Sequence, residues 1–327
     1  MIAFDYVRPN SAKAAIDAIN KDGSGQFIAG GSNLVDLMKH GVVAPQKLID
    51  ISRLPLNAIE QSGNVIHIGA LCLNSAVAEH ALIRQKLPLL AQALNAGASP
   101  QLRNMATVGG NMLQRTRCTY FYDLAMPCNK REPGSGCGAL KGYNRMHAIF
   151  GASNNCIAVH PSDMCVALAA LDATVIINSS KGERKMDFTD FHRLPGDTPE
   201  KDTNLQKGEL ITALEIPLND GFAKHSLYIK IRDRASYAFA LVSVAAALDI
   251  KDNVIQQARL AAGGVAHKPW RLTPAEKYLH GKPPTADNFK TAAEVALKDA
   301  KGFGNTDFKP KLLSNTIVHT LKTIAEA

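Results

Sequence analysis

Thr107-Val108-Gly109-Gly110-Asn111 is a glycine turn of the kind that lets a backbone come close to a phosphate group. A second turn, Ala29-Gly30-Gly31-Ser32-Asn33-Leu34, lies far upstream between an expected strand and an expected helix, whose first amides would point at an anion. Neither turn is the G-x-G-x-x-G dinucleotide fingerprint, and each alone also suits a tight structural turn. Because an Asn follows both glycine pairs, the two turns together predict a cofactor that carries phosphate.

Four cysteines lie between the second turn and Asp163, namely Cys118, Cys128, Cys137 and Cys156. No C-x-x-C pair occurs among them, which argues against common zinc sites and the usual ferredoxin spacing. The spacing alone leaves open an iron–sulfur cluster, unligated thiols, a zinc site or disulfides. A phosphate-bearing cofactor beside a metal centre points to electron transfer. We expect Cys72 and Cys165, which stand apart, to be buried structural thiols.

The length and composition of the chain limit the classes of function that it can have. The chain has 327 residues, enough for two or three domains, with 46% hydrophobic and 20% charged residues, as in globular proteins. The net charge of +8 comes from scattered Lys and Arg, which speaks against nucleic-acid binding and leaves a solvated surface or an acidic protein partner. No secretory signal is evident, and the longest apolar run, 238–248, is about half a membrane span, so we expect no membrane insertion.

Local periodicity predicts the elements around these motifs. Expected helices cover 12–20, 34–41, 88–96, 162–171, 239–250, 275–279, 288–299 and 310–325, with a further helix starting at Asn74. Expected strands cover 26–29, 47–51, 156–159, 174–177, 209–216, 228–232 and 257–262.

The order of several motifs resembles the FAD-binding subunits of the molybdenum hydroxylases, the xanthine dehydrogenase and carbon monoxide dehydrogenase flavoprotein family. The resemblance rests on Phe4-x-Tyr6-x-Arg8-Pro9, the two glycine turns, Ser162-Asp163, Lys230-Ile231-Arg232 and the Gly263-Gly264-Val265-Ala266 segment. It covers nearly the whole chain and is greatest with the flavin subunit of bacterial three-subunit aldehyde oxidoreductases.

The resemblance implies an α+β fold. A two-lobed p-cresol methylhydroxylase-type FAD-binding domain, with lobes at 1–55 and 56–220, would be followed by a carbon monoxide dehydrogenase flavoprotein-like C-terminal α/β domain at 221–327. The cofactor-binding residues that it implies are Phe27, Ile28, Ala29, Gly30, Gly31, Ser32, Asn33, Leu34, Ala106, Thr107, Gly110, Asn111, Asp163, Ile211 and Lys230. The first loop would carry the FAD pyrophosphate, and the second the diphosphate and ribityl region. Asp163 also suits a plain helix N-terminal acid, and Lys230 a surface strand lysine.

The cysteine stretch departs from most members of that family. They pass directly from the second glycine loop to Ser-Asp, whereas this chain inserts roughly forty residues at about 112–157. A subgroup resembling the 4-hydroxybenzoyl-CoA reductase flavin subunit carries a [4Fe-4S] cluster on such an insert. The resemblance therefore implies that Cys118, Cys128, Cys137 and Cys156 ligate a [4Fe-4S] cluster. Such a cluster would either relay electrons or order the insert.

The resemblance also implies a place in a complex. A molybdenum-cofactor subunit would oxidise an aldehyde or a related compound, a [2Fe-2S] subunit would pass the electrons to FAD held here, and an external acceptor would receive them. No residue of this chain is expected to be a catalytic acid or base. We expect a periplasmic complex exported by a partner's twin-arginine signal, or alternatively a cytoplasmic one. The rival hypotheses are a free-standing flavin oxidoreductase and a zinc-binding assembly protein.

Overall fold

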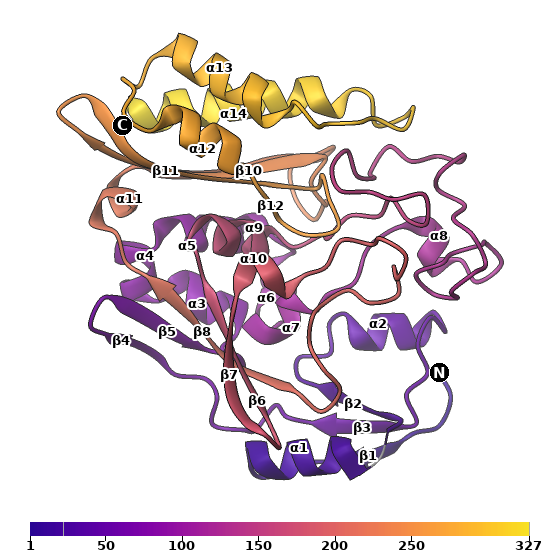
Figure 1. Ribbon diagram of the computed structural model, residues 1–327. Helices are drawn as coiled ribbons and strands as arrows, with labels where there is room; N and C mark the ends of the chain where they lie inside the picture. Colours follow the sequence, from indigo (N-terminus) through magenta and orange to yellow (C-terminus); the bar gives the residue numbers. More distant parts are fainter. Residues whose placement is uncertain (22, 327) are drawn as a thin grey trace.

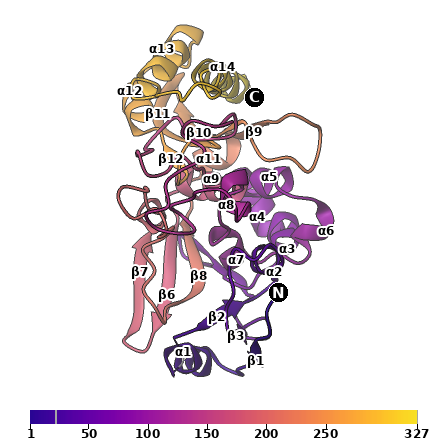
Figure 2. The same cartoon turned by 90° about the vertical axis from the view of Figure 1, so that its right-hand side faces the viewer.

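A computed structural model describes residues 1–21 and 23–326 of the chain, which are arranged in three tiers (Figures 1 and 2). The first tier is a parallel sheet of order β1-β3-β2 with two helices. Its elements are β1 (Asp5–Val7), α1 (Ala12–Lys21), β2 (Gly25–Ile28), α2 (Leu34–Lys39) and β3 (Lys47–Asp50). The expected strand–turn–helix–strand start is thus confirmed, because the glycine turn does link β2 to α2.

The middle tier is an antiparallel five-stranded sheet of order β4-β5-β8-β6-β7, with helices packed on one side. Its strands are β4 (Ile59–Ser62), β5 (Val65–Gly69), β6 (Thr174–Ser179), β7 (Gly182–Asp187) and β8 (Leu210–Pro217). Its helices are α3 (Asn74–Glu79), α4 (Ala81–Lys86), α5 (Pro88–Ala96), α6 (Pro100–Arg103), α7 (Val108–Met112), α9 (Asp163–Ala170) and α10 (Phe188–Phe191). Every residue of α9 is buried, which explains why this helix is apolar on all sides.

The insert between α7 and α9 is mostly irregular and projects from one side of the molecule (Figure 1). It contains the short helix α8 (Thr119–Tyr122) and isolated bridges that pair Cys128 with Cys137 and Ser153 with Cys156. The predicted strand at 156–159 is wrong, since the described residues there form no strand beyond that bridge. The Ile157 carbonyl instead accepts from the Ala148 amide within the insert, at 2.8 Å.

The last tier is an antiparallel sheet of order β12-β11-β10-β9 with helices laid over one face (Figure 1). Its elements are α11 (Asp220–Lys224), β9 (Ser226–Ile231), β10 (Val242–Lys251), β11 (Val254–Gly263), β12 (Trp270–Arg271), α12 (Thr273–Leu279), α13 (Ala286–Ala296) and α14 (Lys309–Ala325). The three C-terminal helices were predicted from sequence and are confirmed, apart from their exact ends. No helix in the described part of the chain is long and apolar enough to cross a membrane.

The predicted helix at 239–250 is wrong, because this segment is the central strand β10. Its residues are buried on both faces of the sheet: Ala245 and Ala247 join the core of the middle tier, while Val244, Ala246 and Leu248 join the core under the C-terminal helices. A strand buried on both faces has no polar alternation, so its apolar run looks like a buried helix.

Candidate functional site

The first glycine loop links β2 to α2 and touches the backbone that leads into the second loop. Gly31 has a φ of +70°, which favours glycine. A Cβ on Gly30 would lie 1.8 Å from the carbonyl oxygen of Met105, so only glycine permits this approach. Intrahelical bonding in α2 starts at the Val35 amide, which donates to the Gly31 carbonyl. The amides before Val35 therefore belong to the open end of the helix.

The second glycine loop begins α7. The Thr107 side chain caps this helix, because its Oγ1 accepts from the Gly110 amide at 3.2 Å. The amides of Val108 and Gly109 donate to carbonyls of Cys72 and Ala70, at 2.9 and 2.8 Å. The protein thus uses these amides itself, and the loop is held rigidly against the middle tier.

Two adjoining clefts, of about 350 and 590 Å³, meet at Ser32, Asn33 and Gly110. Together they are lined by all fifteen residues that the family resemblance implies for cofactor binding. The first cleft holds Phe27, Ile28, Ala29, Gly30, Gly31, Ser32, Asn33, Leu34, Thr107, Gly110 and Ile211. The second adds Ala106, Asn111, Asp163 and Lys230. Sequence reasoning missed the Arg117, Arg234 and Tyr237 side chains of the second cleft, which no motif marks.

Asn33 lies where the two clefts meet, and its two amide atoms differ in their bonding. Its Oδ1 accepts from the Arg115 amide at 3.0 Å, which ties the first loop to the start of the insert. Within the part of the chain that the structure describes, its Nδ2 is buried without a hydrogen-bond partner, and so is Oδ1 of Asn74 in the second cleft. Buried polar atoms are seldom left unpaired. These two therefore fit a ligand that offers hydrogen-bond acceptors and donors, as FAD does.

Asp163 and Lys230 form a buried ion pair in the wall of the second cleft. Lys230 Nζ lies 2.8 Å from Asp163 Oδ2, and both side chains are less than a tenth exposed. The Tyr228 hydroxyl donates to Asp163 Oδ1 at 2.6 Å, and burial raises the pKa of Tyr228 well above its usual value. The pair is thus neither a plain helix-end acid nor a surface lysine. A direct bond from Asp163 to the cofactor stays a prediction.

The four insert cysteines line one small cavity together with Tyr120, Phe121 and Lys130. All four thiols are free of disulfides. Burial raises the pKa of Cys118 to about 12 and that of Cys156 to about 11. Burial therefore disfavours the thiolate forms of these two cysteines.

The cations of the insert are mostly paired. Lys130 is buried and forms an ion pair with Asp202, which Arg115 also contacts through Nε at 2.6 Å. Burial raises the pKa of Asp202, but Lys130 and Arg115 outweigh this effect and lower it to about 2. Arg117 pairs with Asp36 at 2.8 Å. These side chains are therefore not free solvated charges.

Two histidines contact cysteines of the cavity. His147 Nε2 lies 3.1 Å from Cys118 Sγ, and His267 Nε2 lies 3.2 Å from Cys156 Sγ. His147 lies within the cysteine insert itself, so its place in the sequence is a local signal for this contact. Nothing local could mark His267, which is 111 residues from Cys156 along the chain.

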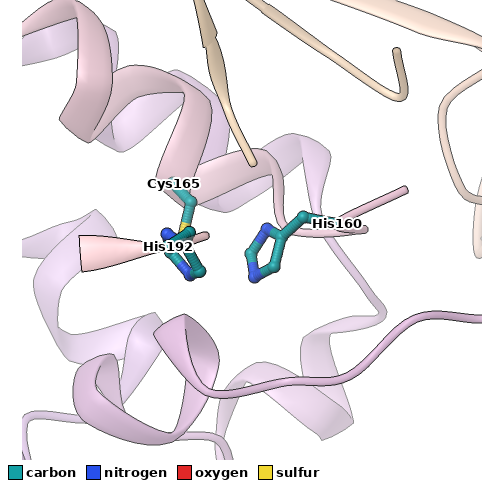
Figure 3. A group of neighbouring side chains, drawn as sticks. All are labelled: His160, Cys165 and His192. Atoms are coloured by element: carbon teal, nitrogen blue, oxygen red, sulfur yellow. The ribbon is translucent and has the colours of Figure 1, made fainter. Parts of the chain in front are cut away.

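A third group, of His160, Cys165 and His192, is buried beside α7 (Figure 3). One ligand-capable atom of each lies within 4.8 Å of the others. Both imidazole Nε2 atoms already face the Met112 carbonyl oxygen, at 3.3 and 2.8 Å. We interpret the group as packing that fixes the end of α7, since burial keeps the pKa of both histidines low and the rings neutral. Cys165 is the buried thiol that the sequence predicted, as is Cys72.

Comparison with known families matches the two parts of the chain to two models. Residues 2–219 match the FAD binding domain in molybdopterin dehydrogenase, and residues 227–321 match the CO dehydrogenase flavoprotein C-terminal domain. The chain is 51% identical over 282 residues to the aldehyde oxidoreductase FAD-binding subunit PaoB of Escherichia coli K12, covering 85% of this chain and 86% of that one. It is 32% identical over 291 residues to the glyceraldehyde dehydrogenase medium chain of Sulfolobus acidocaldarius, covering 89% and 85%.

Solved structures share the fold. A chain of quinoline 2-oxidoreductase from Pseudomonas putida 86 superposes with a TM-score of 0.75 at 25% identity, over 99% of this chain and 98% of that one. A chain of carbon monoxide dehydrogenase from Hydrogenophaga pseudoflava superposes with a TM-score of 0.78 at 23% identity, over the same shares. The predicted fold, a two-lobed FAD-binding domain followed by a C-terminal flavoprotein domain, is confirmed.

Proposed function

This chain belongs to the FAD-binding subunits of the molybdenum hydroxylases, and we propose that it is the electron-transfer subunit of a molybdenum-dependent aldehyde oxidoreductase. In this proposal it takes electrons from a [2Fe-2S] subunit and passes them to an external acceptor. The partner that oxidises the aldehyde is a molybdenum-cofactor subunit. The observation that carries the proposal is the pair of adjoining clefts whose walls include every residue assigned to FAD.

The polar groups in these clefts suit the chemistry of FAD. Bound there, it would supply the conversion between two-electron and one-electron chemistry. The open end of α2 offers amides to the pyrophosphate, and Asn33 Nδ2 offers a donor that lacks a partner among the described residues. Lys230 would place its positive charge beside the isoalloxazine, and Ile211 would pack near the ring system. The lobe boundaries at 55 and 220 stay predictions.

We further propose that the four insert cysteines hold a [4Fe-4S] cluster. All four line one cavity, and the buried Lys130 lines it with them. The four cysteines contain no C-x-x-C pair of the kind common in structural zinc sites, which speaks against a zinc-binding assembly protein.

The position of the cavity favours a relay over a purely structural cluster. A third cleft is lined by both Cys118 and Asp163, and Asp163 also lines the FAD cleft. The proposed cluster would thus lie next to the flavin site. Bound there, it would supply one-electron chemistry.

The aldehyde substrate is proposed from the 51% identity with an aldehyde oxidoreductase subunit. A free-standing flavin oxidoreductase, the remaining rival, would oxidise or reduce its own small molecule without partners. The proposed site of action is the periplasm, reached as a folded complex through a partner's twin-arginine signal. Cell fractionation with and without the partner genes tests this location, and export of this subunit alone would contradict it.

The decisive experiment is an anaerobic visible spectrum of the purified complex before and after dithionite, with flavin, iron and sulfide determined for each subunit. We expect one FAD and about four irons on this chain. Cys128→Ala should lose the iron while keeping the flavin, and Cys72→Ala, a buried thiol outside the cavity, should keep both. Zinc in place of iron would refute the cluster, and a chain without flavin would refute the whole proposal.

A further inference from the structure

Two imidazoles reach the cysteine cavity from different parts of the fold. His147 comes from the end of the insert and approaches Cys118 Sγ to 3.1 Å. His267 comes from the connection between β11 and β12 of the C-terminal tier and approaches Cys156 Sγ to 3.2 Å. Both rings are buried, at 5% and 8% exposure, so water does not compete for these contacts.

The surroundings of each ring decide which nitrogen carries the proton. A neutral imidazole has one N–H and one lone pair. The Nδ1 atoms of both histidines are buried without a partner among the described residues. A proton on Nδ1 would bury an unpaired donor and turn the Nε2 lone pair towards the electron-rich sulfur. The proton therefore belongs on Nε2, where it donates to the sulfur.

One lysine holds both histidine segments. Lys309 begins α14 and is fully buried, and its Nζ donates to the carbonyls of His147 at 2.8 Å and Gly264 at 2.7 Å. Gly264 lies three residues before His267 in the sequence. Nearby, the Ile149 amide donates to the Val265 carbonyl at 2.8 Å. The two histidines are thus fixed relative to each other by one helix of the C-terminal tier.

We propose that His147 and His267 each donate an Nε2–H hydrogen bond to a cluster-ligating thiolate and thereby raise the reduction potential of the [4Fe-4S] cluster, with Lys309 as the positioning residue for both. This inference rests on the proposed cluster. Reduction adds one electron to the cluster, and a donor bond to its sulfur is stronger when the cluster is more negative. Hydrogen bonds to the sulfurs are a general determinant of cluster potentials.

The test is an EPR-monitored redox titration of the intact complex, prepared without air, with His147→Leu and His267→Leu. We expect each loss to disfavour reduction about tenfold, a shift of about 59 mV to lower potential for a one-electron couple. Gln at the same positions keeps a side-chain N–H donor, so His147→Gln and His267→Gln should restore most of the shift. His319→Leu on the exposed face of α14 is the matched control and should leave the potential unchanged.

Pulsed EPR of the wild-type complex labelled with ¹⁵N-histidine gives a readout that does not depend on the variants folding. We expect the reduced four-iron signal to couple to histidine nitrogen. Unchanged potentials in the Leu variants that keep four irons, or no nitrogen coupling in the wild type, would overturn the inference while leaving the cluster in place. A wild-type chain without four irons would instead overturn the proposed function.

Discussion

Replacing Gly30 with Ala should remove FAD from the protein while leaving the fold of the other tiers intact. The added Cβ would lie 1.8 Å from the Met105 carbonyl oxygen and 2.7 Å from its carbonyl carbon. Both are backbone atoms, so no side chain can rotate away. An ordinary contact needs about 3 Å or more, and the two loops must separate by about 1 Å.

That separation should break hydrogen bonds from the loop amides to the FAD pyrophosphate. Each hydrogen bond to a charged group contributes about 1.5–3 kcal/mol. Loss of two such bonds weakens binding by about 3–6 kcal/mol, which corresponds to roughly 10²–10⁴-fold in Kd. A flavoprotein that binds FAD tightly would then be purified largely without flavin.

The assay is the ratio of flavin to protein in the purified complex, together with calorimetric titration of FAD into flavin-free protein. Gly23→Ala is the matched control, because its added Cβ would meet only the flexible end of the Lys207 side chain. A Gly30→Ala protein with full flavin and a Kd within a few-fold of wild type would refute the reasoning that the two loops form one binding surface.

Three further variants test the energetics. Thr107→Val removes the cap on Gly110 and should cost about 1 kcal/mol, read as a lower midpoint in urea unfolding. Lys230→Met leaves the Asp163 carboxylate buried without its cation and should cost about 3–5 kcal/mol in the same assay; adding Asp163→Asn should recover most of the loss. Burial lowers the pKa of Lys309 from 10.5 to about 7, so between these two pH values this lysine binds more protons in the unfolded chain than in the folded one, and its contribution to stability rises with pH. At 1.36 kcal/mol per unit, the gain from pH 7 to pH 9 is about 2 kcal/mol, and Lys309→Met should lack it when unfolding is compared at both values.

The parts that could be predicted from the sequence are those decided by neighbouring residues. The conformation of a Gly-Gly turn between a strand and a helix can be predicted from a few neighbouring positions. The amphipathic pattern of α13 and α14 is local too. The strand β10 could not be recognised in this way. Its character depends on having one core on each face, and those cores are built from segments far away in the sequence.

The same limit applies to the cysteine cavity. The four cysteines stand out because they crowd into one irregular insert. His267 and Lys309 carry no such signal, since each is a single residue in an ordinary segment of the C-terminal tier. Only the fold brings them to the insert, and spacing along the chain cannot report a contact across more than 100 residues.

These contacts give the C-terminal tier a role at both sites. Its strand β9 carries Lys230 into the wall of the FAD cleft, and the segment after β11 carries His267 to the cysteine cavity. Both sites therefore include residues of both matched domains, because Lys230 and His267 lie within residues 227–321 and the other residues of the two sites lie mostly within residues 2–219. A shift of the C-terminal tier by even about 1 Å would disturb both sites together, since buried hydrogen bonds tolerate little displacement. The strand β10 packs against two cores at once, and this packing resists such a shift. The strand that was predicted as a helix from the sequence therefore helps to hold the two proposed redox centres in fixed positions relative to each other.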